Sequence, residues 1–188
     1  MSDKPKISQR PRLAFILPIA AFVIFAVIAA VGLFGTINGT RQSDQLPSVL
    51  VGKPAPELPV TAFSDELSKP LAEFAGQPVL VNVMASWCAP CRAEIPALAL
   101  LSEEVPVIAI AYKDKRDDTA KFFAQYGNPF SAVWMDYDGS YAMKWGIYGV
   151  PESFLLDGQG RIVLRHAGPI FKDTISDVIM PALEALQR

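Results

Sequence analysis

Trp87-Cys88-Ala89-Pro90-Cys91 is the segment that decides the fold. It follows residues 79–84, an almost continuous run of apolar, strand-forming side chains, which is typical of a strand buried on both faces of an α/β sheet. Beyond Cys91, apolar residues recur three and four positions apart, which indicates a helix. The sequence therefore predicts an α/β domain in which two cysteines lie where a central strand passes into the N-terminus of a helix.

The spacing of the two cysteines allows them to close on each other around one helical turn. A helix N-terminus stabilises a nearby negative charge, and the thiolate is the reactive form of cysteine. Cys88, on the loop side, is therefore the predicted nucleophile, and Cys91, inside the helix, is the predicted resolving thiol of a mixed disulfide. Pro90 fits the first helical turn, where its missing N–H is not needed.

A passive disulfide and half of a metal site are the two alternatives for this pair. Structural disulfides usually close longer loops, and the chain has no other cysteine. A zinc site would need further ligands, and His166 is the only histidine. The pattern therefore favours a redox-active disulfide that works without a metal or another cofactor.

The composition indicates one modest domain with appendages, because the chain has 188 residues and a net charge of only −2. No basic face is visible, so a nucleic-acid partner is not expected. The charge run over residues 112–118 carries little net charge and is predicted to be a solvated loop that ends in a helix cap.

The N-terminal segment predicts a transmembrane anchor over residues 13–35. No charged residue occurs from 13 to 40, and residues 13–34 are almost wholly apolar, which is long enough to span a bilayer. A cleaved signal peptide has a shorter apolar core, and no clean small-x-small site follows directly. A buried core helix would not be apolar on all sides over this length.

Charges around this segment predict its orientation. Only Arg41 lies just after the segment, whereas four basic residues precede it: Lys4, Lys6, Arg10 and Arg12. This excess places the N-terminus in the cytoplasm and the cysteines, in a bacterium, in the oxidising periplasm. The expected order is a cytoplasmic tail (1–12), a single-pass inner-membrane anchor (13–35), a proline-containing linker (36–59) and a periplasmic domain (60–188).

The remaining elements follow from periodicity and turn residues. Residues 58–71 are predicted to form short strands or a hairpin, and the terminal helix is expected to kink at Pro181. The first two central strands should be parallel and the closing hairpin antiparallel. The other predicted elements are strands at 105–111, 131–135, 153–156 and 161–165, and helices at 119–126, 141–145 and 175–186.

Several short motifs together resemble one family. They are Gly52-Lys53-Pro54, Asn82-Val83-Met84-Ala85-Ser86-Trp87-Cys88, Tyr112-Lys113-Asp114, Gly127-Asn128-Pro129, Gly146-Ile147-Tyr148-Gly149-Val150-Pro151-Glu152 and Arg165-His166-Ala167-Gly168. From residue 49 to the C-terminus, and in its N-terminal anchor, the chain resembles the membrane-anchored DsbE/CcmG thiol:disulfide interchange proteins of cytochrome c maturation. The resemblance implies a thioredoxin-like fold with a central insertion over residues 113–145.

The resemblance also implies a function and a set of site residues. Family members keep the heme-attachment cysteines of apocytochrome c, or a partner thiol protein, reduced, and they receive electrons from a transmembrane dithiol carrier. Cys88 and Cys91 match the family's cysteine pair, and Pro151 matches the cis-proline of the thioredoxin fold. Trp87, Val150 and Pro151 are the predicted client-binding residues, since the backbone of Val150 could pair with an extended peptide.

One position departs from ordinary thioredoxins. Six residues before the first cysteine, where an aspartate usually handles protons, this chain has Asn82. An amide cannot relay a proton as a carboxylate does, so another group should take that role. Glu152, beside Pro151, is the preferred candidate and is predicted to be catalytic; Glu94 is the second candidate.

Other functions are compatible with the same motif. A general periplasmic thiol reductase would use the same cysteines, whereas a thiol peroxidase usually has a Thr-x-x-Cys arrangement. A non-catalytic binding module could use only the groove beside Pro151. Ala89 and Pro90 place no cation between the cysteines, which favours a reducing pair over a strongly oxidising one.

Overall fold

The computed structural model describes residues 12–37 and 49–186 and divides the chain into two units, Met1–Ser43 and Asp44–Arg188. In the first unit, α1 (Arg12–Ile37) is a helix with Pro18 inside it. Among the described residues, no helix has both the length and the apolar character needed to cross a membrane. The anchor over residues 13–35 stays a prediction, and the predicted tail up to residue 11 and linker residues 38–48 lie outside the described residues.

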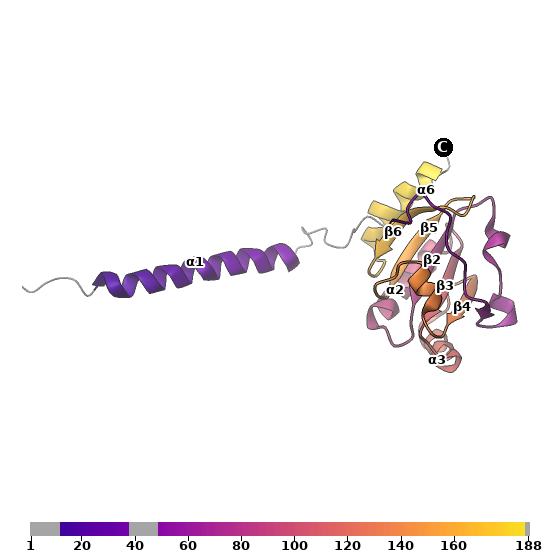
Figure 1. Ribbon diagram of the computed structural model, residues 1–188, viewed down its shortest axis with the longest axis horizontal. Coiled ribbons are helices and arrows are strands. Elements are labelled where there is room, and N and C mark those ends of the chain that lie inside the picture. The colour runs from indigo at the N-terminus through magenta and orange to yellow at the C-terminus, as the bar shows by residue number, and fades with distance from the viewer. Residues whose placement is uncertain (1–11, 38–48, 187–188) are drawn as a thin grey trace, which may run out of the picture. The chain divides into compact units, whose positions relative to one another are not determined.

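The second unit is built on a six-stranded mixed sheet in the order β1-β4-β3-β2-β5-β6 (Figure 1). The strand β2 is parallel to β3, β3 is parallel to β4, and the other pairs are antiparallel, which confirms the predicted parallel pair and the closing hairpin. The strands are β1 (Thr61–Ala62), β2 (Val79–Met84), β3 (Val107–Tyr112), β4 (Ala132–Asp136), β5 (Glu152–Leu156) and β6 (Ile162–Ala167).

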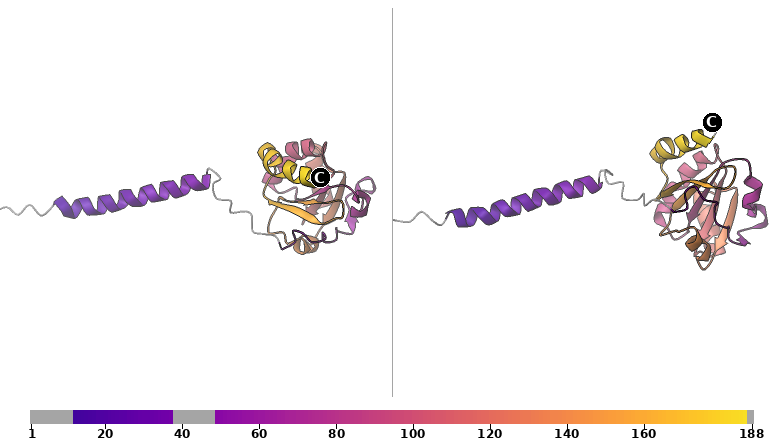
Figure 2. Two further views of the ribbon diagram at one scale, coloured as in Figure 1. Left: turned by 90° about the horizontal axis from the view of Figure 1, so that it is seen from above. Right: turned by 45° about the horizontal axis from the view of Figure 1, so that its top comes forward.

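The helices cover the two faces of the sheet unequally. The α2 and α3 helices and the C-terminal helix pack on one face, and the short α4 lies on the other (Figure 2). Their bounds are α2 (Ala89–Leu101), α3 (Arg116–Tyr126), α4 (Ser140–Lys144), α5 (Lys172–Thr174), the π turn η3 (Ile175–Ile179) and α6 (Met180–Leu186).

Each strand divides its side chains between these faces because successive residues of a strand point in opposite directions. In β2, Leu80 and Met84 join the apolar cluster under α2 and α3. Val79, Val81 and Val83 join the cluster on the opposite face, together with Trp145. This division decides which polar side chains can reach the cysteines.

The segment before β2 differs from the prediction. Residues 58–71 contain only the two-residue β1 and the 3₁₀ turn η1 (Asp65–Leu67), and η2 (Leu71–Phe74) follows at their end. The second half of the predicted linker is part of the domain: the Gly52 N–H donates to the Ile162 carbonyl (2.7 Å), and the Ala55 N–H donates to the Gly160 carbonyl (2.8 Å). The reason is burial, since Leu50, Ala55 and Leu58 pack against the apolar cluster beneath.

The irregularity expected at Pro181 takes the form of the π turn η3. Proline has no N–H to donate to the preceding turn, so an α-helical ladder is interrupted there. The Met180 N–H instead donates to the Ile175 carbonyl, five residues back. The terminal helix thus continues into α6 and buries Ile179 and Leu183.

Gly139, which precedes α4, should be hard to replace. Its φ is +79°, and a Cβ there would lie 2.6 Å from Lys113 Cε and 2.7 Å from Tyr112 Cε2. Gly52 has a similar φ of +83°, but a Cβ there would have no heavy atom within 4 Å. We expect Gly52→Ala to lower the free energy of unfolding by about 1–2 kcal/mol, and Gly139→Ala to lower it by about 1–3 kcal/mol more. Urea unfolding measures both free energies. Equal losses in the two variants would contradict the close contact of a Cβ at position 139 with Lys113 and Tyr112.

Candidate active site

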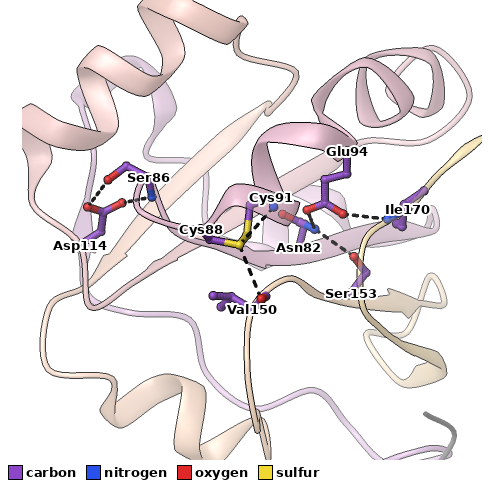
Figure 3. Close-up of a disulfide and its surroundings, with 9 residues drawn as sticks. All are labelled: Asn82, Ser86, Cys88, Cys91, Glu94, Asp114, Val150, Ser153 and Ile170. Carbon is purple, nitrogen blue, oxygen red and sulfur yellow. Dashed lines mark hydrogen bonds between the residues drawn. A yellow bond between two sulfur atoms is a disulfide. The ribbon is translucent and has the colours of Figure 1, made fainter. Parts of the chain in front are cut away.

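The two cysteines form a disulfide at the start of α2 (Figure 3). Cys88 is the N-cap residue, and the Cys91 N–H donates to Cys88 Sγ at 3.1 Å. Cys91 is fully buried, whereas Cys88 keeps 4% of its surface exposed. The geometry therefore supports the predicted division of roles, because a helix N–H directed at the outer sulfur stabilises its thiolate after reduction.

One of the predicted client-binding residues, Val150, contacts the outer sulfur. The Val150–Pro151 peptide bond is cis, as predicted, and the Val150 carbonyl oxygen lies 3.5 Å from Cys88 Sγ. Trp87 is 59% exposed beside this sulfur, while Pro151 is buried. Sequence reasoning did not single out Tyr148, whose side chain is 83% exposed in the same segment. The sequence did contain a feature that could have identified Tyr148, because it is an aromatic residue within the motif that ends at Glu152.

A second group missed by sequence reasoning holds the loop before Cys88. The Asp114 carboxylate accepts hydrogen bonds from the Ser86 N–H (2.6 Å) and the Ser86 hydroxyl (2.7 Å). The Trp87 indole N–H donates to the carbonyl of Lys113 (3.3 Å), which has a positive φ of 46°. Asp114 is only 5% exposed, so this part of the charge run is not the solvated loop that was predicted. It fixes the segment that leads into the disulfide.

A buried carboxyl lies beneath the disulfide. Glu94, one helical turn beyond Cys91, accepts hydrogen bonds from Asn82 Nδ2 (3.0 Å) and the Ile170 N–H (2.9 Å). The Asn82 amide also contacts Ser153 Oγ (3.0 Å) (Figure 3). Burial raises the pKa of Glu94 to about 7, although both hydrogen bonds oppose the rise. Such a carboxyl can take up or release a proton near neutral pH.

Glu152 lies on the other face of the sheet. Asn82 pairs with Ser153 across β2 and β5, and Val83 pairs with Glu152. Adjacent residues point to opposite faces, so Glu152 does not share the face of Asn82 and Glu94. Its carboxylate instead forms an ion pair with Arg165. Burial raises the pKa of Glu152, and Arg165 opposes that rise. The geometry therefore favours Glu94 as the proton carrier, the reverse of the preference drawn from sequence.

Known proteins resemble this chain over most of its length. The Redoxin family model matches residues 50–178. A "Thiol:disulfide interchange protein DsbE homolog" from Paracoccus denitrificans is 38% identical over 171 residues, covering 90% of this chain and 92% of the relative. A DsbE protein from Xylella fastidiosa is 34% identical and covers 100% of this chain and 93% of the relative. The chain belongs to the DsbE family of thiol:disulfide interchange proteins.

A solved structure agrees with this assignment. A crystal structure described as a DsbE protein from Chlorobium tepidum superposes with a TM-score of 0.59 at 26% identity, over 72% of this chain and 99% of that chain. The fold is thus thioredoxin-like, and the chain is a thiol:disulfide oxidoreductase with Cys88 and Cys91 as its cysteine pair. In the part of the chain that the structure describes, no group of His, Cys, Asp or Glu side chains is arranged to hold a metal ion.

The buried state of Glu94 predicts a pH dependence of stability. Because its pKa rises from about 4.5 to about 7 on folding, the folded protein holds a proton that the unfolded chain releases between these values. The resulting stabilisation is complete below pH 4.5 and is lost as the pH rises to 7, a decrease on the order of 3 kcal/mol. Glu94→Gln should remove this decrease from urea unfolding curves recorded between pH 5 and 8. The exposed Glu103→Gln is the control, and a variant at Glu94 with the wild-type pH slope would rule out the raised pKa.

Proposed function

We propose that this chain is a periplasmic thiol-disulfide reductase that keeps either the heme-attachment cysteines of apocytochrome c or a partner thiol protein reduced. The observation that carries the proposal is the similarity to DsbE proteins over 90% or more of the chain, which includes the cysteine pair and the segment around Pro151. The geometry of the disulfide and of the residues around it supports a thiol exchange reaction with a protein client.

The reaction passes two electrons from the enzyme to the client. The Cys88 thiolate attacks one sulfur of the client disulfide, so the client S–S bond breaks, a mixed disulfide forms and one client thiolate leaves. Cys91 loses its proton and attacks Cys88 Sγ, which restores the Cys88–Cys91 disulfide and releases the second client thiolate. In this proposal Glu94, one turn further along α2 and with a pKa of about 7, takes the Cys91 proton. A transmembrane dithiol carrier then reduces the enzyme disulfide.

Two opposing contacts support the reducing direction. The Cys91 N–H favours a negative charge on Cys88 Sγ, whereas the Val150 carbonyl oxygen, 3.5 Å from the same sulfur, disfavours it. Neither Ala89 nor Pro90 adds a cation. A strongly oxidising pair depends on a very stable thiolate, as in DsbA. The helix N-terminus stabilises the Cys88 thiolate, and the Val150 carbonyl destabilises it. The reduced pair is therefore only moderately stable, which favours its action as an electron donor.

The proposed location follows from the sequence. The uncharged stretch from residue 13 to residue 40 is long enough to include a membrane span, and basic residues are concentrated before it. An N-terminus in the cytoplasm and a domain in the periplasm place the cysteine pair where protein disulfides form. The span would keep the reductase at the inner membrane, next to a membrane-bound electron carrier.

Trapping of the mixed disulfide tests the client. Cys91→Ser removes the resolving thiol, so the covalent intermediate should accumulate, whereas Cys88→Ser should trap nothing because the nucleophile is absent. Non-reducing electrophoresis followed by mass spectrometry identifies the trapped species. Polypeptides with a Cys-x-x-Cys-His heme site, or a dedicated thiol partner, are expected.

The trap also separates the alternatives. Many unrelated secreted proteins, with no heme-site polypeptide among them, would indicate a general reductase and refute the specific function. Full activity of Cys88→Ser would indicate a binding module. Oxidation of the wild-type dithiol by peroxide at a rate far above that of free cysteine would indicate a peroxidase.

Membrane attachment is tested by fractionation and reporter fusions. A reporter joined after Thr40 should be active only in the periplasm, and the full chain should stay in the membrane fraction after an alkaline wash. A soluble mature protein that begins near Gly35 would show that the N-terminal segment is a signal peptide instead.

A further inference from the structure

The ion pair between Glu152 and Arg165 lies next to the exposed side chain of Tyr148. The side chains of the pair are only 2% and 11% exposed. A buried pair costs desolvation energy, and the removal of one partner leaves the other as an uncompensated charge. The pair lies on the sheet face opposite Asn82 and Glu94. Its position therefore separates it from the proton chemistry beneath the disulfide.

Arg165 contacts the segment of residues 146–148 in two ways. Its Nη2 donates to the Gly146 carbonyl at 3.2 Å. Its guanidinium carbon lies 5.2 Å from the centroid of the Tyr148 ring, a cation–π distance. The planar guanidinium can make these contacts and the pair with Glu152 at once because its donors form a rigid fork.

Glu152 contacts the same segment from its other side. Its Oε2 accepts a hydrogen bond from the Tyr148 N–H at 3.4 Å. The backbone of Tyr148 is thus bound to one member of the ion pair, and its ring stacks on the other. Tyr148 nevertheless remains 83% exposed. An aromatic surface that is held in place and still open to solvent is suited to bind a partner side chain.

Val150 is held separately from this contact. It precedes Pro151, whose carbonyl accepts a hydrogen bond from the Gly168 N–H at 3.0 Å, and β5 begins at the next residue. We therefore expect the Val150 carbonyl near Cys88 Sγ to keep its place when the contacts of residues 146–148 with the ion pair are lost. A defect in the ion pair should change the surface that a client meets, and not the environment of the sulfur.

We propose that the Glu152–Arg165 pair is a positioning device that holds Tyr148 beside Val150 as a binding surface for the apolar part of a client peptide. This inference rests on the proposed function, because it requires that the client is a polypeptide that lies along Val150. It assigns Tyr148 to client selection, and it makes Glu152 and Arg165 positioning residues. Small disulfides, which do not reach Tyr148, should react independently of the pair.

The test compares two disulfides as oxidants of the reduced enzyme. One is an oxidised peptide with a Cys-x-x-Cys-His sequence and flanking apolar residues, and the other is a small aliphatic disulfide, whose leaving thiol resembles that of a cysteine. Arg165→Lys keeps a cation opposite Glu152 but lacks the planar fork that contacts Gly146 and Tyr148 together. We expect its rate constant with the peptide to fall about tenfold or more. The rate with the small disulfide and the redox potential against glutathione should stay unchanged.

Three further variants make the result specific. Tyr148→Ala should cause a loss with the peptide similar to that of Arg165→Lys, and the two losses should not add in the double variant because both act through one ring. Glu152→Met combined with Arg165→Met removes both charges without leaving one unpaired, so it should fold and still show the peptide-specific loss. Lys144→Met is the control, since it removes a neighbouring cation whose contact with Glu57 is exposed.

Two results would overturn the inference. An equal loss with both disulfides, or a shifted potential, would mean that Glu152 acts on the cysteine chemistry. Wild-type rates with the peptide in folded variants would mean that the pair has no effect on client binding. A different result would contradict the proposed function itself: the wild-type enzyme would react with the peptide no faster than with the small disulfide. In that case the present inference would also lose its basis.

Discussion

Strands β2 and β5 lie side by side in the sheet, and residues paired across them share a face. The pair Asn82–Ser153 points toward α2, and the pair Val83–Glu152 points away from it. One face therefore holds the disulfide and the buried carboxyl of Glu94, and the other holds the ion pair of Glu152. This alternation keeps the carboxyl that we propose as the proton carrier apart from the ion pair that we propose as the positioning group of the client surface.

The replacement of the usual aspartate by Asn82 is explained by Glu94. Asn82 Nδ2 lies 3.0 Å from Glu94 Oε1, so an aspartate at position 82 would bring two carboxyl groups together, and like charges would raise the pKa of one of them strongly. An amide donates a hydrogen bond to the carboxylate instead. The buried carboxyl of this chain therefore lies on the helix and not on the strand, and the Ile170 N–H is its second donor.

Local signals in the sequence were enough for the central strands, the cysteine helix and the closing hairpin, because each depends on neighbouring residues. The cis bond before Pro151 was expected from the resemblance to the family instead. Local signals could not rank Glu94 against Glu152, since that depends on the register between two strands separated by about seventy residues in the chain. The burial of Asp114 was missed for the same reason: its partner, Ser86, is 28 residues away. A run of charged residues therefore predicts solvent exposure only where no group distant in the sequence donates hydrogen bonds to its side chains.

The four residues from Val150 to Ser153 each contact a different part of the site. Val150 faces the outer sulfur, Pro151 turns the chain into β5, Glu152 holds Arg165, and Ser153 contacts Asn82. A shift of β5 by one residue would exchange the faces of Glu152 and Ser153. It would place a charged carboxylate beneath the disulfide and leave a buried guanidinium unpaired, both of which are costly. The register of this one strand therefore fixes both the surroundings of the disulfide and the ion pair of Glu152, although no side chain is shared between them.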